Sequence, residues 1–535
     1  MIIHSKSKDN PLFQAFVLMI LLMLVVSCQP KPMKISKAAS PGIQVEEQEI
    51  LQIRQGFQEG RYTIKELVQA YLERISKIDK SGPALNSIIA INPDAIQIAE
   101  ELDKELKAGK SRGPMHGIPV ILKDNIDTYD QMATTAGSRA LKNSHPLKDS
   151  FIAKRLRESG AVILGKANLS EWANFRGQLS TSGWSGVGGQ TKNPYDLSRN
   201  PCGSSSGSAV AVAANLTMVA IGTETNGSIV CPSQTNGLVG IKPTVGLISR
   251  SGVIPISFTQ DTPGPMARTV RDAAICLGAL VGIDSTDEKT LSAKGQYYSD
   301  YTQFLHTNGL KGKRIGLDKS ALGINFKVDT LFRHAVAFLK QQGATVIEIG
   351  AIDDKKIENY SFEIMLYEFK DGLNKYFKTL GPESPVKNVE DLLAFNKSDS
   401  VELRYFNQYF LELAQKKGDL SSEEYKVALA NLLKGSRADG LDRVMNANDL
   451  DAIIAPTGGP AWKTDLTNGD YFQIGTSSAA AQAGYPAITV PMGFIDELPV
   501  GISFFGRAWS EPMLLEIAYA YENDTKFRKA PKFLK

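Results

Sequence analysis

Residues 202–229, CGSSSGSAVAVAANLTMVAIGTETNGSI, contain the signals that decide the fold. The segment opens with a glycine- and serine-rich loop, and the Ala- and Val-rich residues that follow predict a helix over 208–215. The apolar residues 218–221 predict a strand that leads into a second loop of small residues, 222–229. A helix followed at once by a buried strand favours an α/β protein.

The same alternation extends along the rest of the chain. Thr63 and Glu66 have the spacing of a capping box, and a helical apolar pattern follows them. No internal repeat is evident, so we predict a single domain over 45–535. The other short apolar runs predict strands at 118–122, 161–164, 314–317, 345–349, 452–454 and 488–490, with a helix at 152–158.

The pattern changes between residues 361 and 445. Strand signals disappear there, and aromatic residues recur at helical spacing. We predict a helical insertion at about 361–445 whose aromatic side chains pack the helices together. As a block, these residues could also shape a substrate entrance.

The composition is that of a globular protein with little net charge. The 535 residues are 42% apolar and 22% charged, and 60 basic against 57 acidic side chains give a formal net charge of +3. The chain has no long basic run or arginine-rich patch. This balance argues against nucleic acid as a partner.

The N-terminus has the organisation of an export signal. An almost unbroken apolar run over 11–26 is short for a membrane-spanning helix but suits the core of a signal peptide. The residues Val-Val-Ser-Cys at 25–28 then resemble a bacterial lipoprotein signal. We expect a signal peptide over 1–27, lipidation of Cys28 and a tether over 28–44. The alternative is a short uncleaved anchor helix with a chance cysteine.

Either interpretation places the folded body outside the cytoplasm. The lipoprotein interpretation makes a bacterial membrane the protein's partner through the lipid on Cys28. Gln29 follows that cysteine, which resembles a signal for outer-membrane sorting. If the cell has two membranes, we expect the protein on the periplasmic side of the outer one.

Three further cysteines, Cys202, Cys231 and Cys276, lie in the body. An oxidising compartment permits disulfides, but three cysteines cannot all pair within one chain, and they form no disulfide framework. We expect buried free thiols. A Cys202–Cys231 bridge is the alternative.

Lys123 is the first candidate for catalytic chemistry, because it follows the predicted buried strand 118–122. Burial disfavours the charged ammonium and lowers the pKa of a lysine, which allows the amine to act as a base. The alternative is a solvated lysine with Asp124 as a simple ion-pair partner.

The first loop also matches the G-x-S-x-G nucleophile elbow, with Ser205 at its centre. That elbow follows a strand and requires a later histidine, whereas residues 193–201 have the composition of a loop. Only His306 and His334 come later, and neither has a suitable setting. We therefore reject a Ser-His-Asp triad. Scarce histidine and the absence of paired-ligand spacings also argue against a metal site.

The second loop, 222–229, predicts a site for a negatively charged oxygen. Gly227 allows a tight turn, so that consecutive backbone N–H groups can point at one spot. Such a spot can stabilise an oxyanion, and Ser228 lies beside it. The alternative is an ordinary polar turn.

Together, these motifs resemble the amidase signature family over roughly residues 61–521, with the closest resemblance to bacterial peptide amidases. The resemblance implies an α/β amidase signature fold, in which a central, mixed, many-stranded twisted sheet has helices on both faces. It is carried by residues 121–124, 135–138, 202–208, 222–232, 260–268, 484–491 and 501–506.

Transferred residue by residue, the resemblance implies a Ser-Ser-Lys triad and no metal or organic cofactor. Ser228 is then the nucleophile, Ser204 the bridging serine in a cis peptide, and Lys123 the base. The two serines are 24 residues apart, as in the family. The oxyanion hole would be formed by the backbone N–H groups of Thr225, Asn226, Gly227 and Ser228.

The implied function is hydrolysis of carboxamide bonds through an acyl-enzyme, with C-terminal amides of peptides or amino-acid amides as substrates. Ser206 and Asn226 depart from the common family pattern, and both departures resemble the peptide amidase branch. Fatty-acid or aryl amides are the alternative substrates. The amidotransferase subunit that makes glutaminyl-tRNA is also similar, but the export signal argues against it. An inactive, surface-binding lipoprotein is the alternative of another class, and the presence of all three triad residues opposes it.

Overall fold

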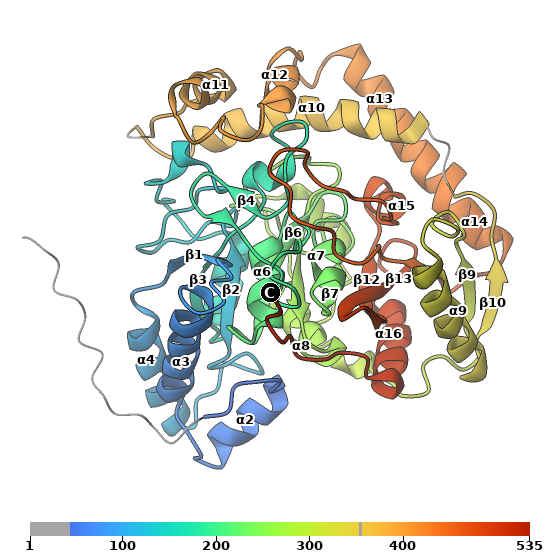
Figure 1. Ribbon diagram of the computed structural model, residues 1–535, viewed down its shortest axis with the longest axis horizontal. Helices are drawn as coiled ribbons and strands as arrows, with labels where there is room; N and C mark the ends of the chain where they lie inside the picture. The colour runs from blue at the N-terminus through green and yellow to red at the C-terminus, as the bar shows by residue number, and fades with distance from the viewer. Residues whose placement is uncertain (1–42, 353–355, 383) are drawn as a thin grey trace, which may run out of the picture. The chain divides into compact units, whose positions relative to one another are not determined.

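The computed structural model describes residues 43–535, apart from 353–355 and 383 (Figure 1). The predicted signal peptide over 1–27, Cys28, and all but the last two residues of the predicted tether lie outside the described residues. From Ile43 to Lys535 the chain forms one compact unit. Among the described helices, none is both long and apolar enough to cross a membrane.

A mixed eleven-stranded sheet organises the body (Figure 1). Its strand order is β1-β3-β2-β6-β8-β7-β12-β13-β11-β9-β10, and parallel pairs such as β2–β6 stand beside antiparallel pairs such as β6–β8. The predicted fold class is confirmed. The strands are β1 (Ile88–Ile91), β2 (Pro119–Lys123), β3 (Val162–Ala167), β6 (Val219–Glu224), β7 (Val239–Lys242), β8 (Thr262–Ala267), β9 (Arg314–Leu317), β10 (Thr345–Glu348), β11 (Ala452–Pro456), β12 (Ala487–Ile495) and β13 (Leu498–Phe505), and a small separate hairpin joins β4 (Trp184–Ser185) to β5 (Gly189–Gln190).

Helices cover both faces of the sheet. On one face, α6 and α7 contact each other and the central strands, and on the other, α8 contacts the central strands together with its neighbours α5 and α16. The capping box predicted at Thr63 and Glu66 is present at the start of α3. The helices around the sheet are α2 (Ile50–Gln58), α3 (Ile64–Arg74), α4 (Ala95–Lys107), α5 (Phe151–Glu158), α6 (Ser206–Ala213), α7 (Val230–Thr235), α8 (Val270–Leu280), α9 (Phe326–Gln341), α15 (Ser478–Ala483) and α16 (Glu511–Thr525).

Between β10 and β11 the described chain is helical, and these helices arch over one side of the molecule (Figure 1). Aromatic packing attaches them to the body: the ring of Phe175 lies 5.9 Å from Phe362, 5.2 Å from Phe369 and 5.3 Å from Phe410. Most of these aromatic residues therefore pack helices together. The helices are α10 (Lys356–Phe377), α11 (Val389–Ser398), α12 (Tyr409–Gln415), α13 (Glu423–Leu433) and α14 (Asp442–Ala447).

The sequence patterns did not predict four strands of the large sheet, namely β1, β7, β8 and β13. In β8 the reason is composition, because Pro263 and Pro265 lack the N–H that a strand normally donates. The structure accommodates them because β7 pairs only with Met266 and Ala267, so the proline-containing part of β8 has β6 as its single partner.

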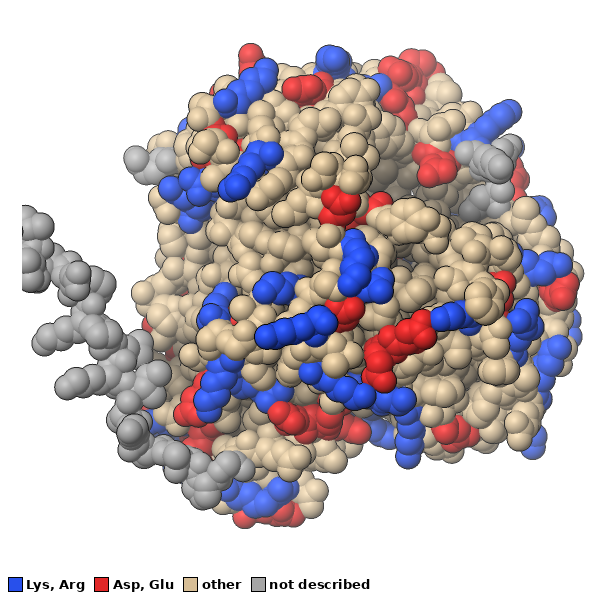
Figure 2. Space-filling model, in the orientation of Figure 1, with Lys and Arg blue, Asp and Glu red and all other residues tan. Residues whose placement is uncertain are grey.

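The surface carries both signs of charge. Figure 2 shows Lys and Arg side chains interspersed with Asp and Glu over the visible face, with uncharged areas between them. This mixture agrees with the small net charge of +3.

Candidate active site

Lys123 is the last residue of β2, and its side chain is completely buried. The strand pairs with β3 at one edge and with β6 at the other, and helix α6 contacts it, so all five of its residues are buried. The Nζ atom of Lys123 donates to Ser204 Oγ at 2.7 Å, to Thr223 Oγ1 at 2.9 Å and to the Thr223 carbonyl at 3.1 Å. These contacts use all three donors of an ammonium; a neutral amine would instead accept one hydroxyl proton.

Burial lowers the pKa of Lys123 to about 7. The physical cause is loss of hydration around the ammonium, while the carboxylates of Asp261 and Glu224 oppose the shift by favouring the charged amine. The direction of this shift is the one that the sequence analysis expected for a buried lysine. Near neutral pH, a large fraction of Lys123 is therefore neutral and able to take a proton from Ser204.

Ser204 lies in the loop that precedes α6 and follows a cis Gly203–Ser204 peptide bond, as the family resemblance implies. The loop is packed tightly, since a Cβ at Gly203 would come within 2.2 Å of Ser170 Oγ. Ser205, the centre of the rejected elbow, is also buried, and its Oγ bonds the Thr223 carbonyl at 3.1 Å. Ser205 therefore anchors the loop to β6 instead of facing a substrate.

Ser228 lies just before α7 and is the partly exposed member of the predicted triad. Its carbonyl accepts a hydrogen bond from the Ser205 N–H at 3.2 Å, which brings the two serine loops together. Within the described residues, the Ser228 hydroxyl makes no hydrogen bond. The structure thus places Lys123 in direct contact with Ser204. Ser228 contacts Ser205, the residue that follows Ser204.

The loop 222–229 is shaped by a glycine and by a buried carboxylate. Gly227 has φ +83°, a conformation that favours glycine. The carboxylate of Glu224, at the end of β6, accepts the N–H groups of Ile229 at 2.7 Å and Val230 at 3.0 Å. Glu224 therefore fixes the chain immediately after Ser228.

Three further contacts hold the same loop from outside. Thr225 Oγ1 donates to the buried carboxylate of Asp261 at 2.6 Å, and Asn226 bonds Ser477 Oγ at 2.6 Å and Ser478 Oγ at 3.1 Å. Burial raises the pKa of Asp261 to about 6. Glu224 and Asp261 lie in segments that carry the family resemblance, but the sequence did not indicate their roles, because a carboxylate that binds backbone N–H groups has no pattern of its own.

Comparison with known proteins identifies the family. The Amidase family model matches residues 66–515 of the chain.

The chain belongs to the amidase signature family. It is a hydrolase that acts on amide bonds.

Similarity to individual members of the family covers nearly the whole body. The amidase is 48% identical to the peptide amidase of Stenotrophomonas maltophilia, with a TM-score of 0.88 over 92% of this chain and 99% of that one. It is 44% identical to a protein of Arabidopsis thaliana described as a probable amidase, over 96% of this chain and 97% of the relative. It is also 32% identical to a glutamyl-tRNA(Gln) amidotransferase subunit of Thermoanaerobacter pseudethanolicus, over 90% of this chain and 97% of that protein.

The expectation of free thiols is wrong for two of the cysteines of the amidase. Cys202 and Cys231 form a disulfide, and their Cα atoms lie 6.0 Å apart, while Cys276 is free and buried. The alternative pairing, Cys202 with Cys231, is therefore the one observed, and it depends on a loop and a helix that meet only in the folded protein.

Asp124 does not pair with Lys123, which was the alternative interpretation of that lysine. Its carboxylate instead accepts hydrogen bonds from Thr135 and lies 3.9 Å from Lys166 Nζ, and burial raises its pKa to about 6. Consecutive residues thus serve different sites, with Lys123 directed to Ser204 and Asp124 directed to the interior beside β3.

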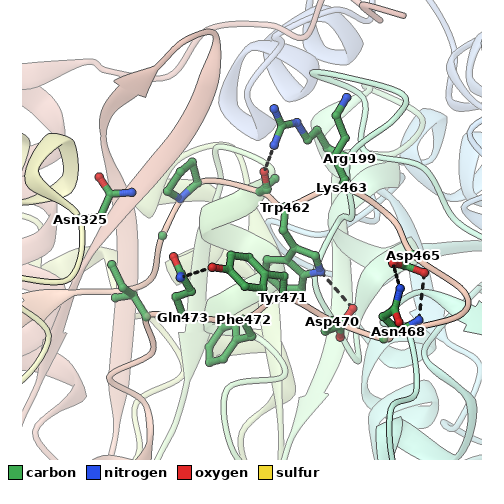
Figure 3. A pocket seen from close by; sticks show the side chains of 15 residues that line it. Arg199, Asn325, Trp462, Lys463, Asp465, Asn468, Asp470, Tyr471, Phe472 and Gln473 are labelled. Atoms are coloured by element: carbon green, nitrogen blue, oxygen red, sulfur yellow. Dashed lines mark hydrogen bonds between the residues drawn. The ribbon is translucent and has the colours of Figure 1, made fainter.

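Residues 457–477, between β11 and α15, contact both serine loops and line a pocket of about 530 Å³. The carbonyl of Trp462 accepts the Asn200 N–H at 2.7 Å, just before the Ser204 loop, and Ser477 bonds Asn226. In Figure 3, Trp462, Tyr471 and Phe472 lie together in the pocket, with Arg199 and Lys463 to one side.

We predict that the hydrolytic rate of the amidase rises with pH through about 7. Below this pH Lys123 is protonated and cannot accept the Ser204 proton, whereas above it the amine is neutral. On the acid side, kcat/KM for an amide substrate should fall roughly 10-fold per pH unit, and it should level off above about pH 8. A flat profile between about pH 5.5 and 8.5 would contradict the assignment.

Lys242 provides a matched control. It is equally buried, its pKa is lowered to about 8, and its Nζ donates to the Tyr485 carbonyl at 2.6 Å and to no serine in the described part of the chain. Lys123→Met should lower kcat by roughly 10³-fold or more. Folded Lys242→Met should keep the wild-type midpoint of the pH–rate profile. If Lys242→Met lost the midpoint of the pH–rate profile, the titrating group would be Lys242 and not Lys123.

Proposed function

We propose that the amidase hydrolyses C-terminal carboxamides of peptides or amino-acid amides through Lys123, Ser204 and Ser228. The observation that carries this proposal is the buried amine of Lys123, which lies 2.7 Å from the Ser204 hydroxyl and has a pKa of about 7. A lysine in this state is a base matched to neutral pH. The similarity to a peptide amidase supports the choice of substrate class.

In the proposed reaction, neutral Lys123 takes the Ser204 proton while Ser204 takes the proton of Ser228. The Ser228 oxygen attacks the carbonyl carbon, the C–N bond breaks, and the proton returns through Ser204 to the leaving ammonia. Water then hydrolyses the ester on Ser228 by the same proton path and releases the carboxylic acid. The partial exposure of Ser228 is consistent with access for both substrate and water.

The backbone N–H groups of Thr225, Asn226, Gly227 and Ser228 are proposed to bind the oxyanion of the tetrahedral intermediate. The turn at Gly227, with φ +83°, supports this assignment because it can direct successive N–H groups to one side. Glu224 bonds the two N–H groups that follow Ser228, so the carboxylate lies behind the loop and not at the reacting carbon.

The pocket beside residues 457–477 is our candidate for the part of a peptide upstream of the scissile amide. Trp462 links the two regions, since it lines the pocket and also packs against Cys202 and Cys231. Tyr471 is 69% exposed and Phe472 is 51% exposed, so a bound peptide could cover aromatic surface there. A peptide amide would then make contacts that an amino-acid amide lacks.

The direct test of the activity is ammonia release from a C-terminally amidated peptide by the purified protein. We expect release by the wild type and a loss of roughly 10³-fold or more in Ser228→Ala. Ser233→Ala is a matched control, because Ser233 is buried in the adjacent helix α7 and its hydroxyl has no hydrogen-bond partner among the described residues. Equal release by wild type and Ser228→Ala would overturn the nucleophile; a wild type active only on acyl or aryl amides would overturn the substrate class.

The pocket assignment predicts a dependence on peptide length. Replacing both Tyr471 and Phe472 with alanine should raise KM for a tripeptide amide by about 10-fold, equivalent to about 1.4 kcal/mol of lost apolar contact, and leave KM for an amino-acid amide unchanged. Tyr129→Ala is the control, because Tyr129 is 67% exposed and does not line the pocket. An equal change in KM for both substrates would show that the upstream part of the peptide does not bind in this pocket.

We also propose that the protein is exported and anchored through a lipid on Cys28. The support is the sequence alone: the apolar run over 11–26 ends in Val-Val-Ser-Cys at 25–28. A lipid anchor would keep the enzyme at a bacterial membrane, on the periplasmic side of the outer membrane if the cell has two.

The anchor has its own test, in a bacterium with a lipoprotein pathway that is fed an alkyne-tagged fatty acid. The wild type should incorporate the label and partition into the membrane fraction, with a mature N-terminus at Cys28. Cys28→Ser should lose the label and remain as uncleaved precursor. Equal labelling of the two forms would refute the site.

A further inference from the structure

The disulfide lies between the two serine loops of the proposed triad. Cys202 is two residues before Ser204, and Cys231 is three residues after Ser228. The bridge therefore connects the loop that carries Ser204 to the first turn of α7, which follows Ser228. Cys276, the third cysteine of the body, is buried in α8 and takes no part.

Each half of the bridge is fixed to the residues that it would position. Cys202 adopts φ +58°, a left-handed conformation that is uncommon for a residue other than glycine, and its carbonyl accepts Ser206 Oγ at 2.6 Å. On the other side, the Cys231 N–H donates to the Gly227 carbonyl at 2.9 Å. A displacement of either sulfur would thus be passed directly to the residues around Ser204 or Ser228.

Other contacts join the same two segments on both sides of the bridge. The Ser205 N–H donates to the Ser228 carbonyl at 3.2 Å, and Thr235 Oγ1 and Asn236 Nδ2 bond the Pro201 carbonyl at 2.7 and 3.0 Å. None of these contacts involves a sulfur atom. The fold should therefore survive loss of the disulfide, while the spacing between the serine loops would have one fewer constraint.

Trp462 closes the remaining side of the bridge. Cys202, Cys231 and Trp462 form a small apolar cluster in which they are 5%, 6% and 8% exposed. Trp462 is itself held by a hydrogen bond from its indole N–H to Asp470 at 3.1 Å. The disulfide therefore packs against Trp462, a residue that lines the pocket of Figure 3.

We propose that the Cys202–Cys231 disulfide is a positioning element of the active site, which holds Ser204 and Ser228 in register, so that full amidase activity requires an oxidising compartment. The inference rests on the proposed triad. In the oxidation step, two thiols lose two electrons and two protons to a disulfide-bearing oxidant, and one Sγ–Sγ bond forms. Reduction by a dithiol is the reverse and converts the dithiol to a cyclic disulfide.

The experiment compares the oxidised enzyme with enzyme reduced by a dithiol under native conditions. Free thiols are counted in each sample, and kcat and KM are measured on an amidated peptide. We expect reduction to lower kcat at least ~10-fold with little change in KM, because small displacements of reacting groups reduce rates steeply. Removal of the reductant and reoxidation should restore kcat.

Variants distinguish a positioning role of the disulfide from backbone strain at Cys202 and from effects of the reductant on other thiols. Cys202→Ala/Cys231→Ala should show the same fall in kcat without reductant, and it should be insensitive to reductant. Cys202→Gly/Cys231→Ala tests whether a residue that accepts φ +58° without strain recovers activity. Cys276→Ala, which keeps the bridge, should remain as sensitive to reduction as the wild type.

Three outcomes would overturn the proposal. The first is kcat within twofold of the wild type in Cys202→Ala/Cys231→Ala. The second is loss of near-ultraviolet circular dichroism in parallel with kcat on reduction, since the bridge would then support the whole fold. The third is full activity of Cys202→Gly/Cys231→Ala, which would leave the bridge no positioning role.

Covalent labelling by a sulfonyl fluoride keeps this test separate from the proposed function. The labelled residue is identified by mass spectrometry in the oxidised wild type. Labelling of Ser228 that slows on reduction supports the positioning role even if the chosen peptide amide is a poor substrate. Failure of the oxidised enzyme to label Ser228 at all would count against the triad, and with it against this inference.

Discussion

The burial of one amine organises the site. Lys123 can have a pKa of about 7 only because β2 lies inside the sheet, helix α6 contacts it and the side chain at the end of the strand is fully buried. A buried lysine must still have partners for its N–H groups. Thr223, on the neighbouring strand β6, supplies two of them, and Ser204 supplies the third. The order of the strands and the position of the Ser204 loop are thus tied to one side chain.

The carboxylates near this lysine have a double effect. Glu224 and Asp261 fix the loop around Ser228 through hydrogen bonds to Ile229, Val230 and Thr225, and both favour the charged form of Lys123. The two carboxylates that hold the loop therefore also raise the pKa of Lys123 and disfavour its neutral form. Desolvation is the larger effect, so the net pKa is still low. Replacing either acid would change the loop and the base together.

Residues that are distant in the chain also hold the loop 222–229 in place. Glu368 on α10 accepts hydrogen bonds from Thr259 and Tyr425, and the nearby Asp261 holds Thr225. On the opposite side, Ser477 bonds Asn226. The arch of helices and the segment 457–477 both reach the loop 222–229 in this way, although each is more than a hundred residues away from it in the chain.

The sequence by itself determined the fold class, the capped start of α3, most of the strands and the candidate site residues, because apolar periodicity, capping and the family motifs are local. It also indicated that burial would lower the pKa of Lys123. Only the tertiary structure decided the strand order, the proline-containing strand β8, the Cys202–Cys231 disulfide and the roles of Glu224 and Asp261. Each of these depends on segments far apart in the chain, or on a partner that local pattern does not specify. A carboxylate beside backbone N–H groups, or two cysteines in a loop and a helix that meet, acquires its role only when folding brings the partners together.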